Sequence, residues 1–219
     1  MVVIGAGGFA KELLQVLLSE KYDFNEENLF FYDDVNMITE KKFFGKYTIL
    51  TSLNQVKEIF KFNSPDFCLG VGMSKIRYAL YRKFENIGGN LKSIISQNTS
   101  IGIFGMDIGE GVTIMNEVII ANAVKVGRGS MINVNVMIGH DSVIGDFCDI
   151  SPGVIITGHC QLGSYVEIGT GVIILPGVKI GNNVDISAGS VISNDIPENS
   201  KVVGTIPSRV IEKLPPFIE

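Results

Sequence analysis

The chain has 219 residues, a hydrophobic content of 46% and a formal net charge of −5 at pH 7. This length allows one or two domains with an ample core, and the negative charge argues against a nucleic-acid partner. No apolar run approaches the roughly 20 residues of a membrane span, and the start MVVIGAGGF lacks the basic flank and cleavage site of a secretion signal.

Strands alternate with helices in residues 1–92. The expected elements, in chain order, are a strand over 1–5, a helix over 11–21, a strand over 28–32, a helix over 53–62, a strand over 66–71 and a helix over 74–86. This alternation predicts a small parallel sheet with right-handed crossovers, which is a Rossmann-like α/β domain.

Possible ligand contacts follow the three expected strands, because open α/β sheets bind ligands at the carboxyl ends of their strands. These contacts are Gly7, Gly8 and Phe9 in GAGGFA, the pair Asp33 and Asp34, and Gly72. The motif alone is weak evidence, since glycines also serve ordinary turns and an acidic pair also caps strands in solvent. Asp33 lies 28 residues after Gly5, whereas dinucleotide sites use a spacing of about 20. We therefore favour a nucleotide site and keep a dinucleotide-binding oxidoreductase as an alternative.

A six-residue repeat fills residues 108–192. Its fifteen anchors are Ile108, Ile114, Ile120, Val126, Ile132, Ile138, Ile144, Ile150, Ile156, Leu162, Ile168, Ile174, Ile180, Ile186 and Ile192. A period of six predicts a parallel β-helix, in which three repeats close one triangular coil and the coils stack. Fifteen anchors predict five coils. Ile101 and Ile108 are seven apart, so we expect the β-helix domain, 93–219, to begin near Ser93 with one inserted residue.

Both histidines of the chain lie in this repeat. His140 and the next residue, Asp141, occupy a corner, and stacking at an 18-residue interval puts Gly158 on His140 and His159 on Asp141. Histidine takes up a proton near neutral pH, and a neighbouring carboxylate favours the protonated form. His159 is more simply read as solvated. A three-histidine zinc site would lack a ligand, and Cys148 and Cys160 point inward, so no metal is expected. The odd count of three cysteines indicates reduced thiols in the cytoplasm.

These motifs resemble the sialic-acid O-acetyltransferase-like family, whose best-understood members are nucleotide-amino-sugar N-acetyltransferases of bacterial glycan synthesis. The resemblance rests on IGHDSVIGDF (138–147), the unbroken hexapeptides, the series GAGGFA, YDD and VGMSKIR, and the closing VGTIPSRVI. It implies a left-handed β-helix, a homotrimer that binds acetyl-CoA between subunits, and a UDP-linked 4-amino sugar in the N-terminal domain.

The resemblance also implies roles for single residues. His140 is similar to the general base and Asp141 to its acidic partner. The expected coenzyme contacts are Gly158, which donates to the thioester oxygen, and Asp149, Thr170 and Ala188, which use backbone groups. The expected nucleotide-sugar contacts are Gly7, Gly8, Phe9, Asp33, Asp34 and Gly72. Phe9 replaces a histidine common in the amino-sugar enzymes and Met73 replaces a polar residue, so the sugar itself is left open.

The expected reaction is direct acetyl transfer to an amino group, because no cysteine or serine stands beside His140 and Ser142 points inward. The nearest alternative is O-acetylation of a sugar hydroxyl. A non-catalytic scaffold is a further alternative, against which the cluster at His140 argues.

Overall fold

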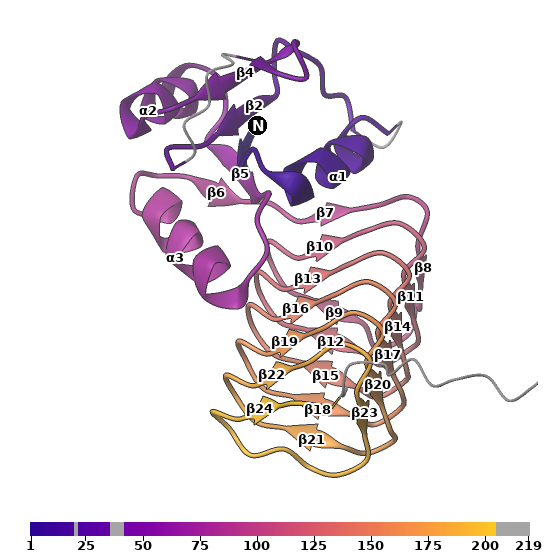
Figure 1. Cartoon of the computed structure of the whole chain (residues 1–219). Coiled ribbons are helices and arrows are strands. Elements are labelled where there is room, and N and C mark those ends of the chain that lie inside the picture. The colour runs from indigo at the N-terminus through magenta and orange to yellow at the C-terminus, as the bar shows by residue number, and fades with distance from the viewer. Residues whose placement is uncertain (20–21, 36–41, 205–219) are drawn as a thin grey trace, which may run out of the picture.

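The computed structural model describes residues 1–19, 22–35 and 42–204. It has an N-terminal α/β domain seated at one end of a triangular prism of stacked coils (Figure 1). Most of the motif VGTIPSRVI and the tail with Pro215 and Pro216 lie outside the described residues. The first helix was predicted to run to Lys21, but it ends at Leu17, with Leu18 as its C-cap. None of the helices in the described part of the chain is long and apolar enough to cross a membrane.

The N-terminal domain is built on a six-stranded sheet in the order β3-β4-β2-β1-β5-β6. Its strands are β1 (Val2–Ile4), β2 (Phe30–Tyr32), β3 (Lys42–Phe43), β4 (Tyr47–Leu50), β5 (Asp66–Leu69) and β6 (Asn90–Leu91). All pairs are parallel except β3 with β4. The sequence predicted the three central strands and missed β3, β4 and β6, which add to the two edges of that core.

Helices cover both faces of this sheet. They are α1 (Gly8–Leu17), α2 (Leu53–Phe62) and α3 (Ser74–Glu85). The bounds of α2 are those predicted, and a capping box formed by Ser52 and Gln55 fixes its start. One buried cluster contains α1 and the other contains residues of α2 and α3, so α1 lies on one face and the other two helices on the opposite face.

The prism has three faces, numbered here in chain order. Face 1 holds β7 (Ile94–Ile95), β10 (Thr113–Ile114), β13 (Met131–Ile132), β16 (Asp149–Ile150), β19 (Glu167–Ile168), β22 (Asp185–Ile186) and β24 (Lys201–Val202). Face 2 holds β8 (Ser100–Ile101), β11 (Ile119–Ile120), β14 (Met137–Ile138), β17 (Ile155–Ile156), β20 (Ile173–Ile174) and β23 (Val191–Ile192). Face 3 holds β9 (Asp107–Ile108), β12 (Lys125–Val126), β15 (Val143–Ile144), β18 (Gln161–Leu162) and β21 (Lys179–Ile180). The corners are named by the faces that they join.

The repeat behaves as predicted but extends further. Each of the fifteen anchors is the second residue of a two-residue strand, and strands 18 residues apart pair in parallel. Within the described residues the three faces hold seven, six and five strands, which make six coils. The fifteen anchors account for five of these coils. The sixth is made up by β7 and β8, which follow the predicted start near Ser93, and by β24, which was not predicted. The glycines after the anchors let coils approach: a Cβ at Gly145 would lie 2.4 Å from the carbonyl carbon of Gly163.

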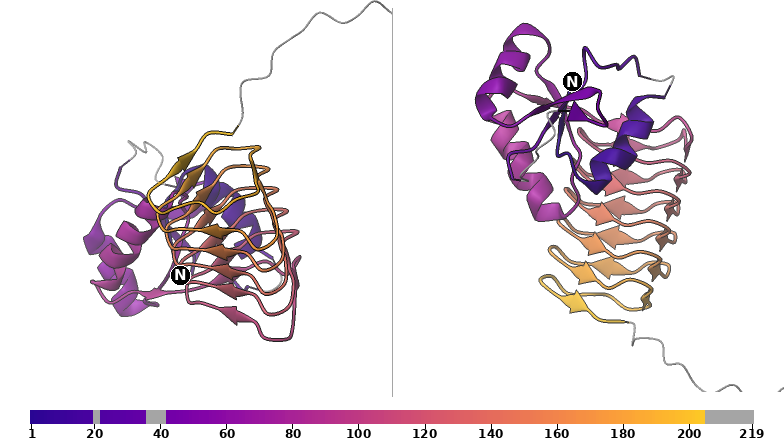
Figure 2. Two further views of the ribbon diagram at one scale, coloured as in Figure 1. Left: turned by 90° about the horizontal axis from the view of Figure 1, so that it is seen from below. Right: turned by 45° about the horizontal axis from the view of Figure 1, so that its top comes forward.

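The N-terminal domain packs against face 1 of the prism, and α3 runs down beside it (Figures 1 and 2). On the α1 side, Ile94 and Met115 join the buried cluster of the N-terminal domain. On the α3 side, Phe147 of corner 3–1 joins the other cluster. Corner 2–3, which lies opposite face 1, carries none of these contacts.

Candidate active site

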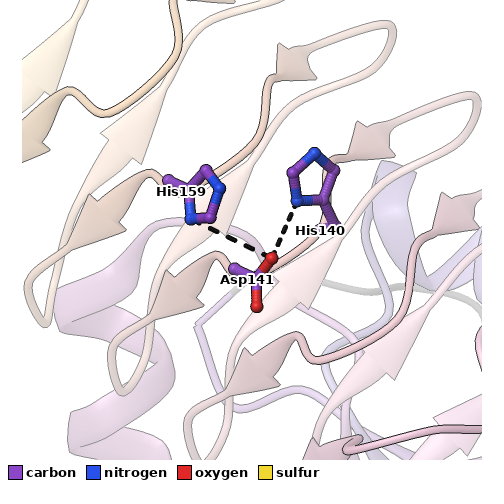
Figure 3. Close-up of side chains that lie close together, drawn as sticks. All are labelled: His140, Asp141 and His159. Carbon is purple, nitrogen blue, oxygen red and sulfur yellow. Dashed lines mark hydrogen bonds and ion pairs between the residues drawn. The ribbon is translucent and has the colours of Figure 1, made fainter.

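Corner 2–3 brings His140, Asp141 and His159 together, and Figure 3 shows both imidazole rings turned toward the one carboxylate. His140 Nδ1 lies 2.8 Å from Asp141 Oδ2, and His159 Nδ1 lies 3.9 Å from the same oxygen. The two rings meet edge to face with centroids 4.9 Å apart. The stacking of His159 on Asp141 is therefore confirmed, and His159 is close enough to interact with the predicted pair.

The backbone of this corner holds the side chains in place. Asp141 and His159 have φ values of 58° and 60°, the left-handed region that aspartate and histidine enter more readily than most residues. The His159 N–H donates to the carbonyl of His140 at 2.9 Å. Successive coils therefore present these residues one above the other.

Gly158 lies directly against the outer nitrogen of His140. A Cβ added at Gly158 would be 2.8 Å from His140 Nε2. Its N–H has no hydrogen-bond acceptor among residues 1–19, 22–35 and 42–204. The corner thus combines an imidazole nitrogen, a bare stretch of backbone and an available N–H donor.

The side chains that could form a covalent intermediate near this corner point into the core. Ser142 is fully buried, and its Oγ donates to the carbonyl of Thr157 at 3.0 Å. Cys160 is fully buried, like Cys68 and Cys148. Burial raises the pKa of the Cys148 thiol to about 12. The corner is therefore suited to direct transfer rather than to an acyl-enzyme.

The carboxyl ends of β1, β2 and β5 enclose a cavity of about 280 Å³. Its lining comprises Gly5, Ala6, Gly7, Gly8, Phe9, Asp33, Gly70, Val71, Gly72, Met73 and Ile76. Five of the six residues predicted from the strand ends are in this set. The other lining residues also lie at these predicted strand ends, over 5–9 and 70–74, except Ile76, which belongs to the first turn of α3.

Gly7 and Gly8 leave space that the chain does not use. A Cβ at either position would meet no atom of the described residues within 4 Å, whereas one at Gly70 would lie 2.6 Å from the Val3 side chain. Gly7 caps α1 without a side-chain hydrogen bond. The N–H groups and partial positive charge of this helix end therefore face a cavity open to an anionic ligand.

The two aspartates of the predicted pair lie in different surroundings. Asp33 is buried and lines the cavity. Asp34 accepts hydrogen bonds from Lys83 Nζ at 2.8 Å and Tyr32 Oη at 2.7 Å. These bonds, from Lys83 first, lower the pKa of Asp34. Both bonds end at Oδ2 and hold the Asp34 carboxylate beside Lys83, and Asp34 is not part of the cavity lining.

Asp149 lies beside the cavity rather than beside the other predicted coenzyme contacts. Its Oδ2 accepts the Met73 N–H at 2.7 Å and lies 3.2 Å from where a Gly72 Cβ would be. Glu167, one coil further, accepts the Ser74 N–H at 3.0 Å. Burial raises the pKa of Asp149, while the Met73 bond and the charge of Arg77 act in the opposite direction. These two carboxylates cap α3 from the prism.

Arg77 is a fully buried cation that ties the domains together. Its guanidinium donates to the carbonyls of Gly129 at 3.0 Å, Val71 at 2.7 Å and Leu69 at 3.3 Å, and to Thr113 Oγ1 at 3.4 Å. Burial lowers its pKa to about 10, so it stays charged at neutral pH. The sequence placed Arg77 in a helix but gave no sign of these partners.

Thr170 and Ala188, the remaining predicted coenzyme contacts, are exposed on corner 1–2. They stack one coil apart, and the Gly189 N–H donates to the Thr170 carbonyl at 2.9 Å. The predicted coenzyme contacts thus fall on three parts of the prism: corner 2–3, corner 1–2 and face 1.

Comparison with known families covers both domains. Residues 1–84 match the PglD N-terminal domain, and residues 123–158 and 159–194 match the bacterial transferase hexapeptide (six repeats). A comparison with curated proteins gave no match.

Several solved structures are similar over nearly the whole chain. WeeI from Acinetobacter baumannii is 25% identical, with 96% of this chain and 98% of that chain covered and a TM-score of 0.82. The acetyltransferase domain of PglB from Neisseria gonorrhoeae is 26% identical, with 93% and 95% covered and a TM-score of 0.72. PerB from Caulobacter crescentus, in complex with CoA and GDP-perosamine, is 23% identical, with 96% of each chain covered and a TM-score of 0.81.

These likenesses confirm a Rossmann-like domain followed by a left-handed β-helix. The matched models account for both halves of the fold, and the alignments with solved structures run across the junction between them. The chain therefore combines a PglD N-terminal domain with bacterial transferase hexapeptide repeats, which supports the predicted resemblance to hexapeptide-repeat acyltransferases.

Proposed function

We propose that the protein transfers the acetyl group of acetyl-CoA to the amino group of a nucleotide-linked amino sugar. The main observation is the pair His140–Asp141 with the available Gly158 N–H against His140 Nε2. The open cavity at the start of α1 supplies a site for the nucleotide sugar. Similar structures hold CoA with GDP-perosamine, or acetyl coenzyme A, which supports both co-substrates.

The corner supplies what direct acyl transfer needs. The neutral amine attacks the thioester carbonyl carbon, and His140 Nε2 takes up the proton that the amine loses. Asp141 accepts a hydrogen bond from Nδ1–H, which keeps the Nε2 lone pair directed at the substrate. The Gly158 N–H donates to the oxyanion of the tetrahedral intermediate. As the C–S bond breaks, the proton on His140 passes to the departing sulfur of CoA.

The two halves of this site lie on different sides of one prism. The cavity abuts face 1 through Gly72 and Asp149, whereas His140 is on the opposite corner. His140 precedes Asp149 by half a coil, which corresponds to a height difference of roughly 2.4 Å along the prism. A cyclic trimer about an axis parallel to the prism preserves height. It would therefore bring His140 of one chain level with the cavity of the next.

A ligand panel tests the proposed reaction. Acetyl transfer is measured with UDP-, GDP- and dTDP-linked 4-amino sugars and with the matching 4-hydroxy sugars, and thermal shifts report binding. Acetylation of an amino sugar with sequential kinetics is expected. Acetylation of the hydroxy sugars alone would replace N-transfer with O-transfer. Binding of nicotinamide dinucleotide without acetyl transfer would instead support an oxidoreductase.

The shared site is tested by complementation. His140→Ala chains keep their cavity, and Gly8→Val chains keep their base, so each homotrimer should be nearly inactive. Trimers refolded from a mixture should regain activity, because some sites combine one intact base with one intact cavity. A stable monomer in light scattering, or no recovery in mixed trimers, would contradict a site between subunits.

Gly8→Ala should separate binding from folding. The added Cβ projects into open space, so the melting temperature should not fall. It should nevertheless hinder the approach of a diphosphate and raise the Michaelis constant for the nucleotide sugar about tenfold, equivalent to ~1.4 kcal/mol. The control is Glu12→Ala on the exposed side of the same helix. An unchanged Michaelis constant for Gly8→Ala would place the phosphates elsewhere.

Asp33→Ala and Asp34→Ala should differ, since only Asp33 lines the cavity. Asp33→Ala is expected to raise the Michaelis constant for the nucleotide sugar and spare that for acetyl-CoA. Asp34→Ala mainly frees Lys83 and should change both constants little. Steady-state kinetics with each substrate varied in turn provide the measurement. A larger effect of Asp34→Ala would mean that its side chain turns from Lys83 to the ligand.

A further inference from the structure

His140, Asp141 and His159 form a set of metal-ligand atoms on corner 2–3. Each residue offers one ligand atom, and these atoms lie within 4.8 Å of one another. In a tetrahedral zinc site, ligand atoms about 2.0–2.2 Å from the ion are roughly 3.3 Å apart. The distances from Asp141 Oδ2, 2.8 Å to His140 Nδ1 and 3.9 Å to His159 Nδ1, bracket that value. Small side-chain rotations would therefore complete a three-ligand site.

The chemistry of the ligands selects the ion. Two imidazole nitrogens and one carboxylate oxygen suit Zn²⁺ and other late transition metals, whereas Mg²⁺ and Ca²⁺ prefer oxygen ligands alone. The sequence lacks a third histidine for a three-histidine zinc site, but Asp141 offers the third ligand atom here. All three side chains are exposed, so the ion has access and an open coordination position remains.

We propose that Zn²⁺ binds reversibly to His140, Asp141 and His159 and inhibits acetyl transfer. This proposal rests on the proposed function for its inhibitory effect but not for metal binding itself. A neutral histidine that ligates a metal through Nδ1 carries its proton on Nε2. Nε2 then cannot accept a proton from the amine, and Asp141 is withdrawn from its role beside the imidazole. The metal would thus hold the base in the wrong tautomer.

His159→Asn is the informative variant. Asparagine tolerates the left-handed backbone at this position and removes the ligand nitrogen. His159 has no assigned step in acetyl transfer, so the turnover of metal-free His159→Asn should stay near that of the parent chain. Loss of groups that merely orient a ligand lowers metal affinity about 10–100-fold, so removal of a ligand should do at least as much.

The test uses tag-free, chelator-treated full-length chain. Zn²⁺ titration by calorimetry, without CoA because its thiol binds zinc, should show a site that is weakened at least about tenfold in His159→Asn. Acetyl transfer by the parent chain should fall on adding Zn²⁺, recover with EDTA and ignore Mg²⁺. The inhibitory Zn²⁺ concentration should rise similarly in His159→Asn.

Two results would overturn the proposal: no Zn²⁺ binding to the parent chain, or equal affinity and equal inhibition in parent and variant. If the protein acetylates amino sugars but gives one of these two results, the metal site is wrong and the proposed function stands. A chain that binds Zn²⁺ through His159 but acetylates nothing retains the metal site and loses the proposed function.

Discussion

Replacement of His140 by alanine is expected to lower turnover by about 10²–10⁴-fold while leaving the fold intact. The imidazole is exposed and contributes nothing to the core, so the melting temperature should barely change. What is lost is the imidazole nitrogen held against Gly158, where the amine and the thioester are proposed to meet. Acetyl transfer under saturating substrates, followed by release of CoA thiol, measures the effect.

Two further variants identify the source of that loss. Asp141→Asn should cost less than His140→Ala, because the amide still fills the corner but cannot accept a hydrogen bond with a negative charge. His159→Asn should cost little in the absence of metal. If His159→Asn lowered metal-free turnover as strongly as His140→Ala, the base would be the other histidine or the pair.

Replacement of Arg77 by methionine is expected to destabilise the N-terminal domain by about 3 kcal/mol or more. The cation donates four hydrogen bonds in a fully buried setting, and each abandoned buried acceptor costs about 1–3 kcal/mol. Urea denaturation followed by the fluorescence of the tyrosines in this domain measures the loss. The Michaelis constant for the nucleotide sugar should rise as well, because Val71 on the cavity rim loses its donor.

Arg82 provides the matched control on the same helix. It is half-exposed and its ion pair with Glu85 spans 3.5 Å on the surface. Arg82→Met should therefore change the free energy of unfolding by less than about 0.5 kcal/mol. A comparable loss in both variants would show that helix propensity, rather than the buried hydrogen bonds, determines the stability of α3.

The β-helix could be predicted in detail because its signal is local and repeated. Anchors such as Ile138 and Ile156 recur without a slip, and a fixed 18-residue coil then sets which corner residues stack. That arithmetic was enough to put Gly158 against His140 and His159 above Asp141. It also placed the start of the prism near Ser93, but it missed β24, where the sequence departs from the repeat.

Contacts between the domains were beyond the same reasoning. The sequence around Asp149 shows an outward position on the prism, and nothing in it reveals that α3 begins there. In the sequence, Arg77 is one of several basic residues of a helix, yet its partners on the prism, Thr113 and Gly129, are 36 and 52 residues away. The difference between Asp33 and Asp34 likewise depends on Lys83, which a separate helix supplies. Such pairings arise from packing and not from periodicity.

The open space beside Gly7 and Gly8 affects which substitutions evolution can accept in this protein and its relatives. Because no atom in the described part of the chain lies within 4 Å of a Cβ there, substitutions at these two glycines should be nearly neutral for folding and should be selected mainly through the ligand. A Cβ at Gly5 would lie 2.6 Å from the Val71 side chain, and a Cβ at Gly70 would lie 2.6 Å from the Val3 side chain. Substitutions at these two glycines would therefore disturb folding and be selected against. Natural drift in acceptor preference should therefore accumulate at Gly7 and Gly8, while Gly5 and Gly70 stay constant.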